Sequence, residues 1–304
     1  MQQIKRRNAL EPVKPSSSNT AKKWLIGCGI GCGAILLIVI LLIMGGFFFI
    51  KNIADDFKDS AALMDTLIDE YGEIEAYCPD PDGTIKPERL KAFLAAREAM
   101  VPAREELERS IRFLQDERGS KEGNEEESRS VFKKVTMGFG LIPRISDFYK
   151  ARVQALMDAD MGIGEYYYIY TITYFSWLEK PLLDGPDFQI RDDNQGYRFR
   201  EWEDEEAQEV RQDMTVRWLH RIMLPMLKNQ YEKLIEEDKP RVHGQWRRAL
   251  EAEIKAMEDN RYRMVWEDGL PDVLKNSLES FRPQLEASYS PLTNSLEVAL
   301  ERRQ

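Results

Sequence analysis

The sequence predicts an all-α protein: one N-terminal transmembrane helix, followed by a multi-helix, bundle-like domain outside the cytoplasm. Three observations support this. Residues 24–50 contain no charged side chain. Apolar residues in the rest of the chain recur mainly at intervals of three and four, the spacing of amphipathic helices. Runs that alternate apolar and polar residues, as half-buried strands do, are rare. The 304-residue chain therefore divides into a tail at 1–23, a membrane span at 24–50 and a helical domain at 51–304.

The uncharged run at 24–50 is long enough to cross a bilayer, because about 20 helical residues span its hydrocarbon core. A cleaved signal peptide is the alternative, but its apolar part usually covers only about 7–15 residues and ends in small residues. This run has 27 residues and ends in Phe-Phe-Phe-Ile. We therefore expect an uncleaved, single-pass signal-anchor.

Charge is divided unequally on the two sides of the predicted span. Residues 1–23 carry a net charge of +5 and residues 51–304 a net charge of −15. Because positively charged flanks stay in the cytoplasm, the basic tail is expected inside and the large domain outside. The predicted location is a bacterial inner (plasma) membrane, with a cytoplasmic, disordered N terminus and a periplasmic or extracellular main domain. An acidic domain lacks the basic face of a nucleic-acid binder, so no nucleic-acid partner is expected.

Four glycines alternate through the cytoplasmic end of the predicted span: Gly27, Gly29, Gly31 and Gly33. Pairs of small residues four apart let two helices approach closely in lipid. One interpretation is a packing face for a homodimer or for another membrane protein. The alternative is that glycine is simply common in membrane spans, and the shortness of the motif favours this alternative.

The predicted outer domain opens with a helix that continues from the span and ends near Gly72. A turn at Asp80–Gly83 follows, and the next helix begins at Pro87, a residue favoured in the first helical turn. Pro102 is expected to kink or divide that helix. Residues 116–130 are rich in Glu, Gly and Ser and predict a mobile loop.

The second half of the domain is also expected to be helical. Helical spacing resumes at Val131 and breaks around Gly138–Gly140. Residues 182–199 hold several turn-forming residues and predict a loop. The helix that follows has Glu205 and Glu206 near its start and is expected to be interrupted at Pro225. Three shorter helices are expected near 241–258, 271–285 and 291–302.

Residues 162–178 are the most apolar part of the outer domain and predict a helix buried on all sides at the centre of the bundle. Tyrosine combines an apolar ring with a hydroxyl, which suits a small-molecule pocket. The candidate pocket residues are Glu165, Tyr167, Tyr170, Tyr174 and Trp177. The alternatives are a core helix whose hydroxyls find internal partners, and a second membrane span, which Glu165 and the tyrosines disfavour.

Glu165 is the only charged residue between Asp160 and Glu179. A buried carboxylate is a candidate acid or base. A carboxylate in the first turn of a helix instead complements the helix dipole. Its position just after Gly162 and Gly164 favours the second role.

Motifs for catalysis or for metal binding are missing from the sequence. The chain has only two histidines, His220 and His243, and no HExxH motif. The Asp80–Gly83 region does not fit a calcium loop, because Arg89 would occupy the position of the last oxygen ligand. Cys78, the only cysteine of the outer domain, is expected to be a partly buried free thiol. No catalytic residue, metal site or cofactor is assigned.

These observations leave three hypotheses about function. The leading one is a membrane-anchored, non-catalytic envelope protein that acts through protein contacts. The second is an extracytoplasmic small-molecule-binding or sensory domain that uses the tyrosine-rich helix at 162–178. The third is a hydrolase with a site that no motif reveals.

Overall fold

The computed structural model describes residues 62–119, 127–190, 197–200, 205–237 and 244–299. Contacts divide the chain into residues 1–54 and 55–304, and every described residue belongs to the second unit. The predicted span, with Gly27, Gly29, Gly31 and Gly33, lies outside the described residues. Within the described part of the chain, no helix combines the length and apolar character needed to cross a membrane.

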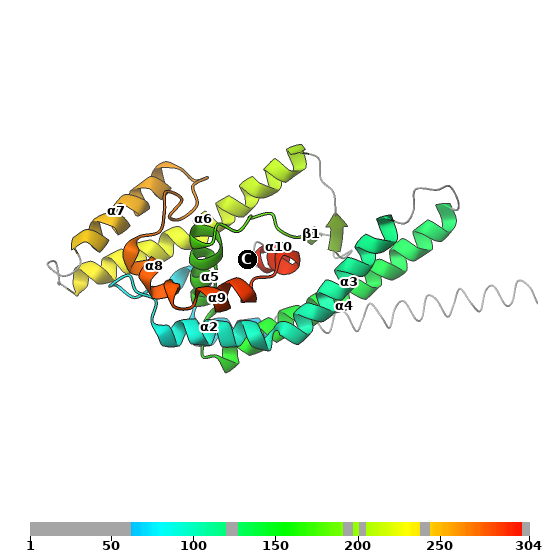
Figure 1. Cartoon of the computed structure of the whole chain (residues 1–304), viewed down its shortest axis with the longest axis horizontal. Coiled ribbons are helices and arrows are strands. Elements are labelled where there is room, and N and C mark those ends of the chain that lie inside the picture. The colour runs from blue at the N-terminus through cyan, green and yellow to red at the C-terminus, as the bar shows by residue number, and fades with distance from the viewer. Residues whose placement is uncertain (1–61, 120–126, 191–196, 201–204, 238–243, 300–304) are drawn as a thin grey trace, which may run out of the picture. The chain divides into compact units, whose positions relative to one another are not determined.

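The described part is helical apart from one short hairpin (Figure 1). After a helical segment at 62–71, the elements in chain order are η1 (Ile74–Ala76), α2 (Pro87–Ala99), α3 (Val101–Gly119), α4 (Glu127–Asp158), α5 (Ile163–Tyr170), η2 (Thr171–Trp177), β1 (Asp187–Ile190), β2 (Tyr197–Arg200), α6 (Glu205–Glu236), α7 (Gly244–Asp259), α8 (Asp272–Glu279), α9 (Arg282–Ser288) and α10 (Pro291–Ala299). An all-α fold is therefore confirmed for these residues, with the hairpin as its one departure.

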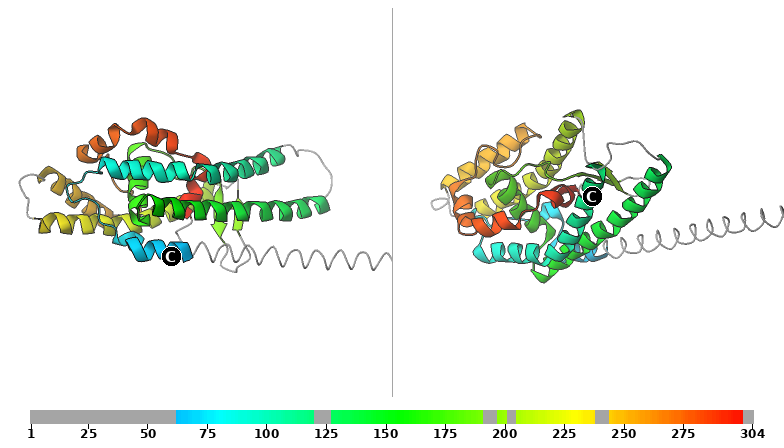
Figure 2. Two further views of the ribbon diagram at one scale, coloured as in Figure 1. Left: turned by 90° about the horizontal axis from the view of Figure 1, so that it is seen from below. Right: turned by 45° about the vertical axis from the view of Figure 1, so that its right-hand side comes forward.

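Two pairs of long helices flank a central run. α3 lies along α4, and α6 lies along α7 (Figures 1 and 2). α5 and η2 form one continuous run near the centre, with α10 beside it. Residues 161–175 are all buried, whereas Ser176 and Leu178 are half-buried, so the prediction of a helix covered on every side is confirmed for all but its C-terminal end.

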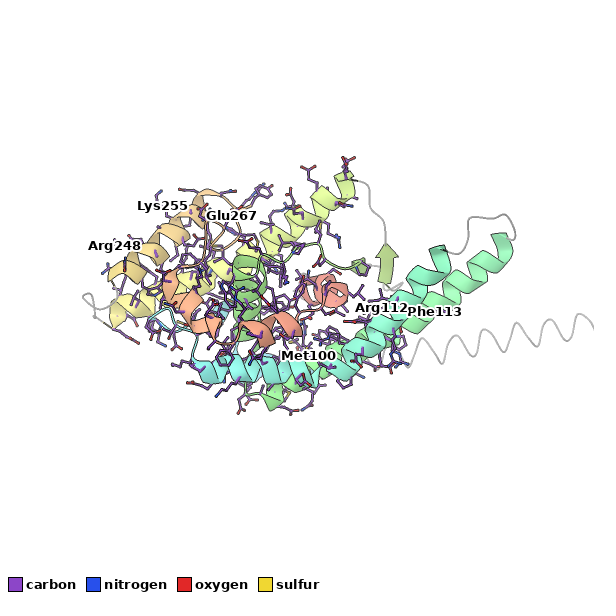
Figure 3. All side chains as sticks on the ribbon, in the orientation of Figure 1. Met100, Arg112, Phe113, Arg248, Lys255 and Glu267 are labelled. Carbon is purple, nitrogen blue, oxygen red and sulfur yellow. The ribbon has the colours of Figure 1, made fainter. Side chains whose placement is uncertain are left out.

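Local turn signals locate several boundaries correctly. The helical segment at 62–71 ends at Gly72, whose φ of +85° is left-handed and whose N–H donates to the Ile68 carbonyl at 2.7 Å. The turn at Asp80–Gly83 is closed by a bond from the Gly83 N–H to the Asp80 carbonyl at 3.0 Å. The helix that starts at Pro87 divides at Met100, two residues before Pro102 (Figure 3).

Two predicted interruptions are wrong. α4 runs unbroken through Gly138–Gly140 and also contains Pro143. α6 runs unbroken through Pro225. An interior glycine costs a helix only about 1 kcal/mol and a proline about 3 kcal/mol. Packing along α3 and α7, respectively, outweighs these local costs over helices of 32 residues each.

Two further predictions need correction. The predicted loop at 182–199 contains most of an antiparallel hairpin, in which Asp187 pairs with Arg200 and Ile190 with Tyr197. Its strands are rich in aromatic and β-branched residues, which favour strands. The predicted helix at 271–285 divides into α8 and α9, because Pro283 cannot donate the hydrogen bond that an uninterrupted helix needs there. The predicted loop at 116–130 is shortened by α3 and α4 at its ends, and residues 120–126 are not described.

Candidate functional site

A fully buried ion pair lies at the centre of the domain. Arg97 of α2 and Glu297 of α10 are both completely buried, and Nη1 of the arginine lies 2.9 Å from Oε2 of the glutamate. The Tyr166 hydroxyl donates to the same Oε2 at 2.5 Å and accepts a bond from Arg97 at 2.7 Å. The three side chains join α2, α5 and α10 at one point.

The remaining donors of Arg97 also have partners. Its Nε and Nη2 donate to the Ser288 carbonyl at 3.0 and 2.7 Å. The guanidinium lies 5.3 Å from the ring centres of both Tyr170 and Tyr174, a cation–π arrangement. Burial alone would lower the pKa of Arg97, but the neighbouring Glu297 and tyrosines raise it well above its usual value. The buried arginine is therefore charged and fully engaged.

Three of the five candidate pocket residues contribute their hydroxyls to this network. Tyr167 donates to the Glu297 carbonyl oxygen at 2.6 Å, and Tyr170 donates to Oδ1 of Asn294 at 2.8 Å. The Tyr174 and Ser288 hydroxyls share a bond of 2.7 Å. All three tyrosine side chains are completely buried. The structure thus gives each hydroxyl a partner within the chain.

The other two candidates lie apart from this network. Glu165 is in the first turn of α5 and forms a bidentate ion pair with Arg89 of α2, at 2.6 and 2.5 Å. The Arg282 guanidinium lies 4.3 Å from the Trp177 ring centre. The five residues therefore do not converge on one point.

Tyr166 belongs to the network but is absent from the sequence-based candidates. Its ring lies 5.8 Å from that of Tyr170, which lies 4.7 Å from that of Tyr174. The three tyrosines are spaced four apart, so helical periodicity alone offered a signal for this row. What the spacing did not reveal was the partner, Glu297.

A recess opens at the C-terminal end of η2, away from the buried ion pair. It has a volume of about 520 Å³. Four stretches of chain line it: the end of η2 with the residues that follow (175, 176, 179, 180 and 182), two residues of α6 (Gln212 and Val216), Tyr262, and residues 264–269 (Glu267 is labelled in Figure 3). None of the five candidate pocket residues is in this lining.

The backbone around the recess is unusual in three ways. η2 is π-helical, with the Leu178 N–H bonded to the Thr173 carbonyl five residues earlier. Glu179 and Trp266 have left-handed φ values of 50° and 55°. Such a φ is disfavoured for a residue as bulky as tryptophan. Residues held in sparsely populated conformations cluster at binding and active sites, and π-helical turns do so as well.

Hydrogen bonds and ion pairs hold residues 263–268, which carry the left-handed Trp266, in place. Glu253 of α7 accepts a bond from the Trp266 N–H at 2.7 Å and pairs with Arg263 at 3.0 Å. Arg263 also pairs with Asp268 at 2.8 Å. From the other side, the Ser176 hydroxyl of η2 donates to the Val265 carbonyl at 2.7 Å. Contacts from α7 and from η2 therefore hold the backbone of Trp266 in its left-handed conformation.

Sequence reasoning did not find this recess, because its lining comes from four stretches without a shared motif. Comparison of the chain with protein-family models, curated proteins and solved structures gave no match. In the described ranges, no group of three or more His, Cys, Asp or Glu side chains could hold a metal ion. Cys78 is a free, half-buried thiol, and burial raises its pKa.

Proposed function

We propose that this protein is a membrane-anchored, extracytoplasmic binding protein that performs no catalysis, and that it binds a small molecule at the recess. One observation carries the proposal: Trp266, a bulky residue with a left-handed backbone, lines the recess. The volume of about 520 Å³ lies within the range of small-molecule sites, about 300–1,000 Å³. Its lining combines seven apolar or aromatic residues with six polar or charged ones, so it offers both packing surface and hydrogen-bonding groups to a polar small molecule.

A thermal-shift screen of the purified full-length protein tests this proposal. The screen covers amino acids, sugars, organic acids, polyamines and nucleotides. A ligand present at about 100 times its dissociation constant stabilises the folded state by about 2.7 kcal/mol. We expect at least one class to raise the midpoint of thermal unfolding. If no class does so, the proposal fails.

Two tryptophan variants of α6 test whether a ligand that raises the midpoint of thermal unfolding binds at the recess. Gln212 is exposed and lines the recess, so Gln212→Trp is expected to fill part of it and abolish the shift. Arg221 is exposed on the same helix but outside the lining, so Arg221→Trp is expected to keep the shift. A shift that survives Gln212→Trp unchanged would place the ligand elsewhere.

Contact with another protein is a second candidate function. Val210 and Met214 lie one turn apart on α6 and are 53% and 49% exposed. Exposed apolar side chains that share a helix face are a feature of protein interfaces. A photo-crosslinking residue at position 214, expressed at native levels in membranes, is expected to capture another protein, whereas one at the exposed Glu251 of α7 is not. Recovery of the protein alone at both positions would count against this function.

The proposed location rests on the charge distribution and on the uncharged run at 24–50. Protease added to the outside of spheroplasts is expected to digest the main domain and to leave an N-terminal tag intact. Protection of the main domain until the membrane is dissolved would contradict this orientation.

A further inference from the structure

The C-terminal helix α10 holds one wall of the recess. This wall is the segment at 178–186, which includes the lining residue Leu182. The Asn294 side-chain amide donates to the Leu182 carbonyl at 3.2 Å. The Ser295 N–H donates to the Asp184 carbonyl at 3.1 Å, and its hydroxyl donates to the Pro186 carbonyl at 2.5 Å. Consecutive residues of α10 therefore bond to the backbone of the wall between Leu182, which lines the recess, and Pro186.

The wall and α10 touch without intervening space. Gly185 has a left-handed φ of +90°. A β-carbon at this position would lie 2.7 Å from the Pro291 carbonyl oxygen and 2.8 Å from that of Leu292. On its other side the wall is bonded to α6, where Arg211 donates to the Leu183 carbonyl at 3.1 Å. The wall is thus held between two helices.

A second link joins the wall to the residues just before α10. The Tyr289 hydroxyl donates to Oδ2 of Asp184 at 2.9 Å. The Lys180 ammonium, which belongs to the recess lining, lies 5.5 Å from the centre of the Tyr289 ring. The position of the wall therefore depends on residues 289–295 through both backbone and side-chain contacts.

The attachment of α10 itself depends strongly on polar contacts. It has only nine residues, and isolated helices of that length are unstable in water. Residues 293–298 are all buried, and four of the six are polar or charged. The ion pair with Arg97 anchors Glu297, and removing one partner of such a pair leaves an uncompensated buried charge. A single ion pair therefore has a large effect on whether α10 is docked.

We infer that α10 is a regulatory element of the recess: its docking through Glu297 orders the wall at 178–186, and its release loosens that wall. The inference rests on the proposed binding function of the recess. Coupling between two sites is reciprocal. A ligand that contacts the ordered wall therefore stabilises docked α10 by the same free energy by which docked α10 strengthens binding of the ligand.

Hydrogen exchange measured by mass spectrometry on the full-length protein tests the coupling without a ligand. In Glu297→Gln, we expect exchange to accelerate by about tenfold or more in both 289–299 and 178–186, because both lose native contacts. Exchange in α7 is expected to stay at its native rate. The matched control is Asp259→Asn, which breaks an exposed ion pair with Lys255 on α7 and is expected to change neither segment. Acceleration confined to 289–299 would overturn the inference.

If Glu297→Gln unfolds the whole domain, a second variant tests whether α10 orders the wall at 178–186. The double variant Asn294→Ala/Ser295→Ala removes the side-chain bonds to the wall, together with the bond that Tyr170 donates to Asn294, and keeps the Arg97–Glu297 pair. We expect accelerated exchange at 178–186, with most protection of 296–299 retained. An unchanged exchange rate at 178–186 would overturn the coupling.

The experiments distinguish failure of the small-molecule function from failure of the coupling between α10 and the wall. If the exchange rates are coupled but no compound stabilises the protein, the small-molecule function fails and the coupling stands. If a compound from the thermal-shift screen stabilises the native protein and binds equally tightly to the double variant, the function stands and the regulation is overturned.

Discussion

Arg97 and Glu297 lie 200 positions apart in the chain, yet their side chains meet at 2.9 Å in the interior, where neither is exposed. Arg97 is on the second described α-helix from the N terminus and Glu297 is on the last. The pair therefore links the two ends of the described domain. Burying two charges is costly unless each is paired and hydrogen-bonded, and here Tyr166 and Ser288 supply the remaining bonds.

Replacing one partner of this pair is expected to cost far more than an average substitution. Arg97→Met or Glu297→Leu alone is expected to lower the free energy of unfolding by about 3–5 kcal/mol, because the other charge remains buried without a partner. The double variant is expected to lose clearly less than the sum of the two, since no unpaired charge remains. Urea unfolding followed by tryptophan fluorescence measures all three. Strictly additive losses would contradict the role of the pair.

Replacing Glu165, which pairs with Arg89, tests whether this glutamate has a structural or a catalytic role. Glu165→Gln is expected to lower the free energy of unfolding by about 1–3 kcal/mol, because a bidentate, charge-assisted contact between α2 and α5 is lost. Lys86→Ala removes the more exposed pair with Asp80 and is expected to cost only about 0–1 kcal/mol. A Glu165→Gln variant with native stability that had lost a hydrolytic activity would support the hydrolase hypothesis instead.

The buried tyrosines predict a loss of stability at alkaline pH. Burial raises the pKa of Tyr166, Tyr168 and Tyr170 above the ordinary tyrosine value of about 10. The folded state therefore holds these protons more tightly than the unfolded state. Their stabilising contribution is fully present below about pH 10 and is lost as the pH rises through the folded values. Tyrosinate absorbance from these residues is expected to appear together with the loss of helical circular dichroism. Its complete appearance in a folded protein would refute this assignment.

Two glycines provide a matched pair of substitutions. Gly83 has a φ of +78°, and a β-carbon there would lie 2.4 Å from the Trp246 ring. Gly83→Ala is expected to lower the free energy of unfolding by about 1–3 kcal/mol. Gly244, at the start of α7, has no atom within 4 Å of such a β-carbon. Gly244→Ala is expected to be neutral or to stabilise by up to about 1 kcal/mol. Equal effects in thermal unfolding would contradict this account of the Gly83 turn.

Features that depend on a few neighbouring residues were predicted more accurately than features that depend on packing between distant parts of the chain. Gly72 and Pro102 mark boundaries through backbone chemistry that acts within a few residues, and both were located correctly. Pro225 carries a similar local signal, but the helix continues through it because of packing against α7. The hairpin at 187–200 was missed because its strands have only four residues each and the turn-forming residues around them were interpreted as one loop.

The candidate site shows the same division. The tyrosines of 162–178 were recognised as a group, because helical spacing is visible in a single stretch of sequence. Their partners, Glu297 and Asn294, gave no comparable signal, because a contact between distant residues depends on how helices pack. The recess depends on four separate stretches and on the strained backbone at Trp266, neither of which periodicity reports.

Hydrophobic periodicity and turn chemistry are short-range properties of the chain, so the helical class, the central position of 162–178 and several boundaries could be predicted without a structure. The sequence also supports the prediction of a basic tail, an uncharged span and an acidic domain. The bonds from the tyrosines to a buried Arg97–Glu297 pair, and the recess at the C-terminal end of η2, became visible only in the folded protein. The reason is physical: these features exist only where helices distant in sequence pack together and exclude water from the groups between them.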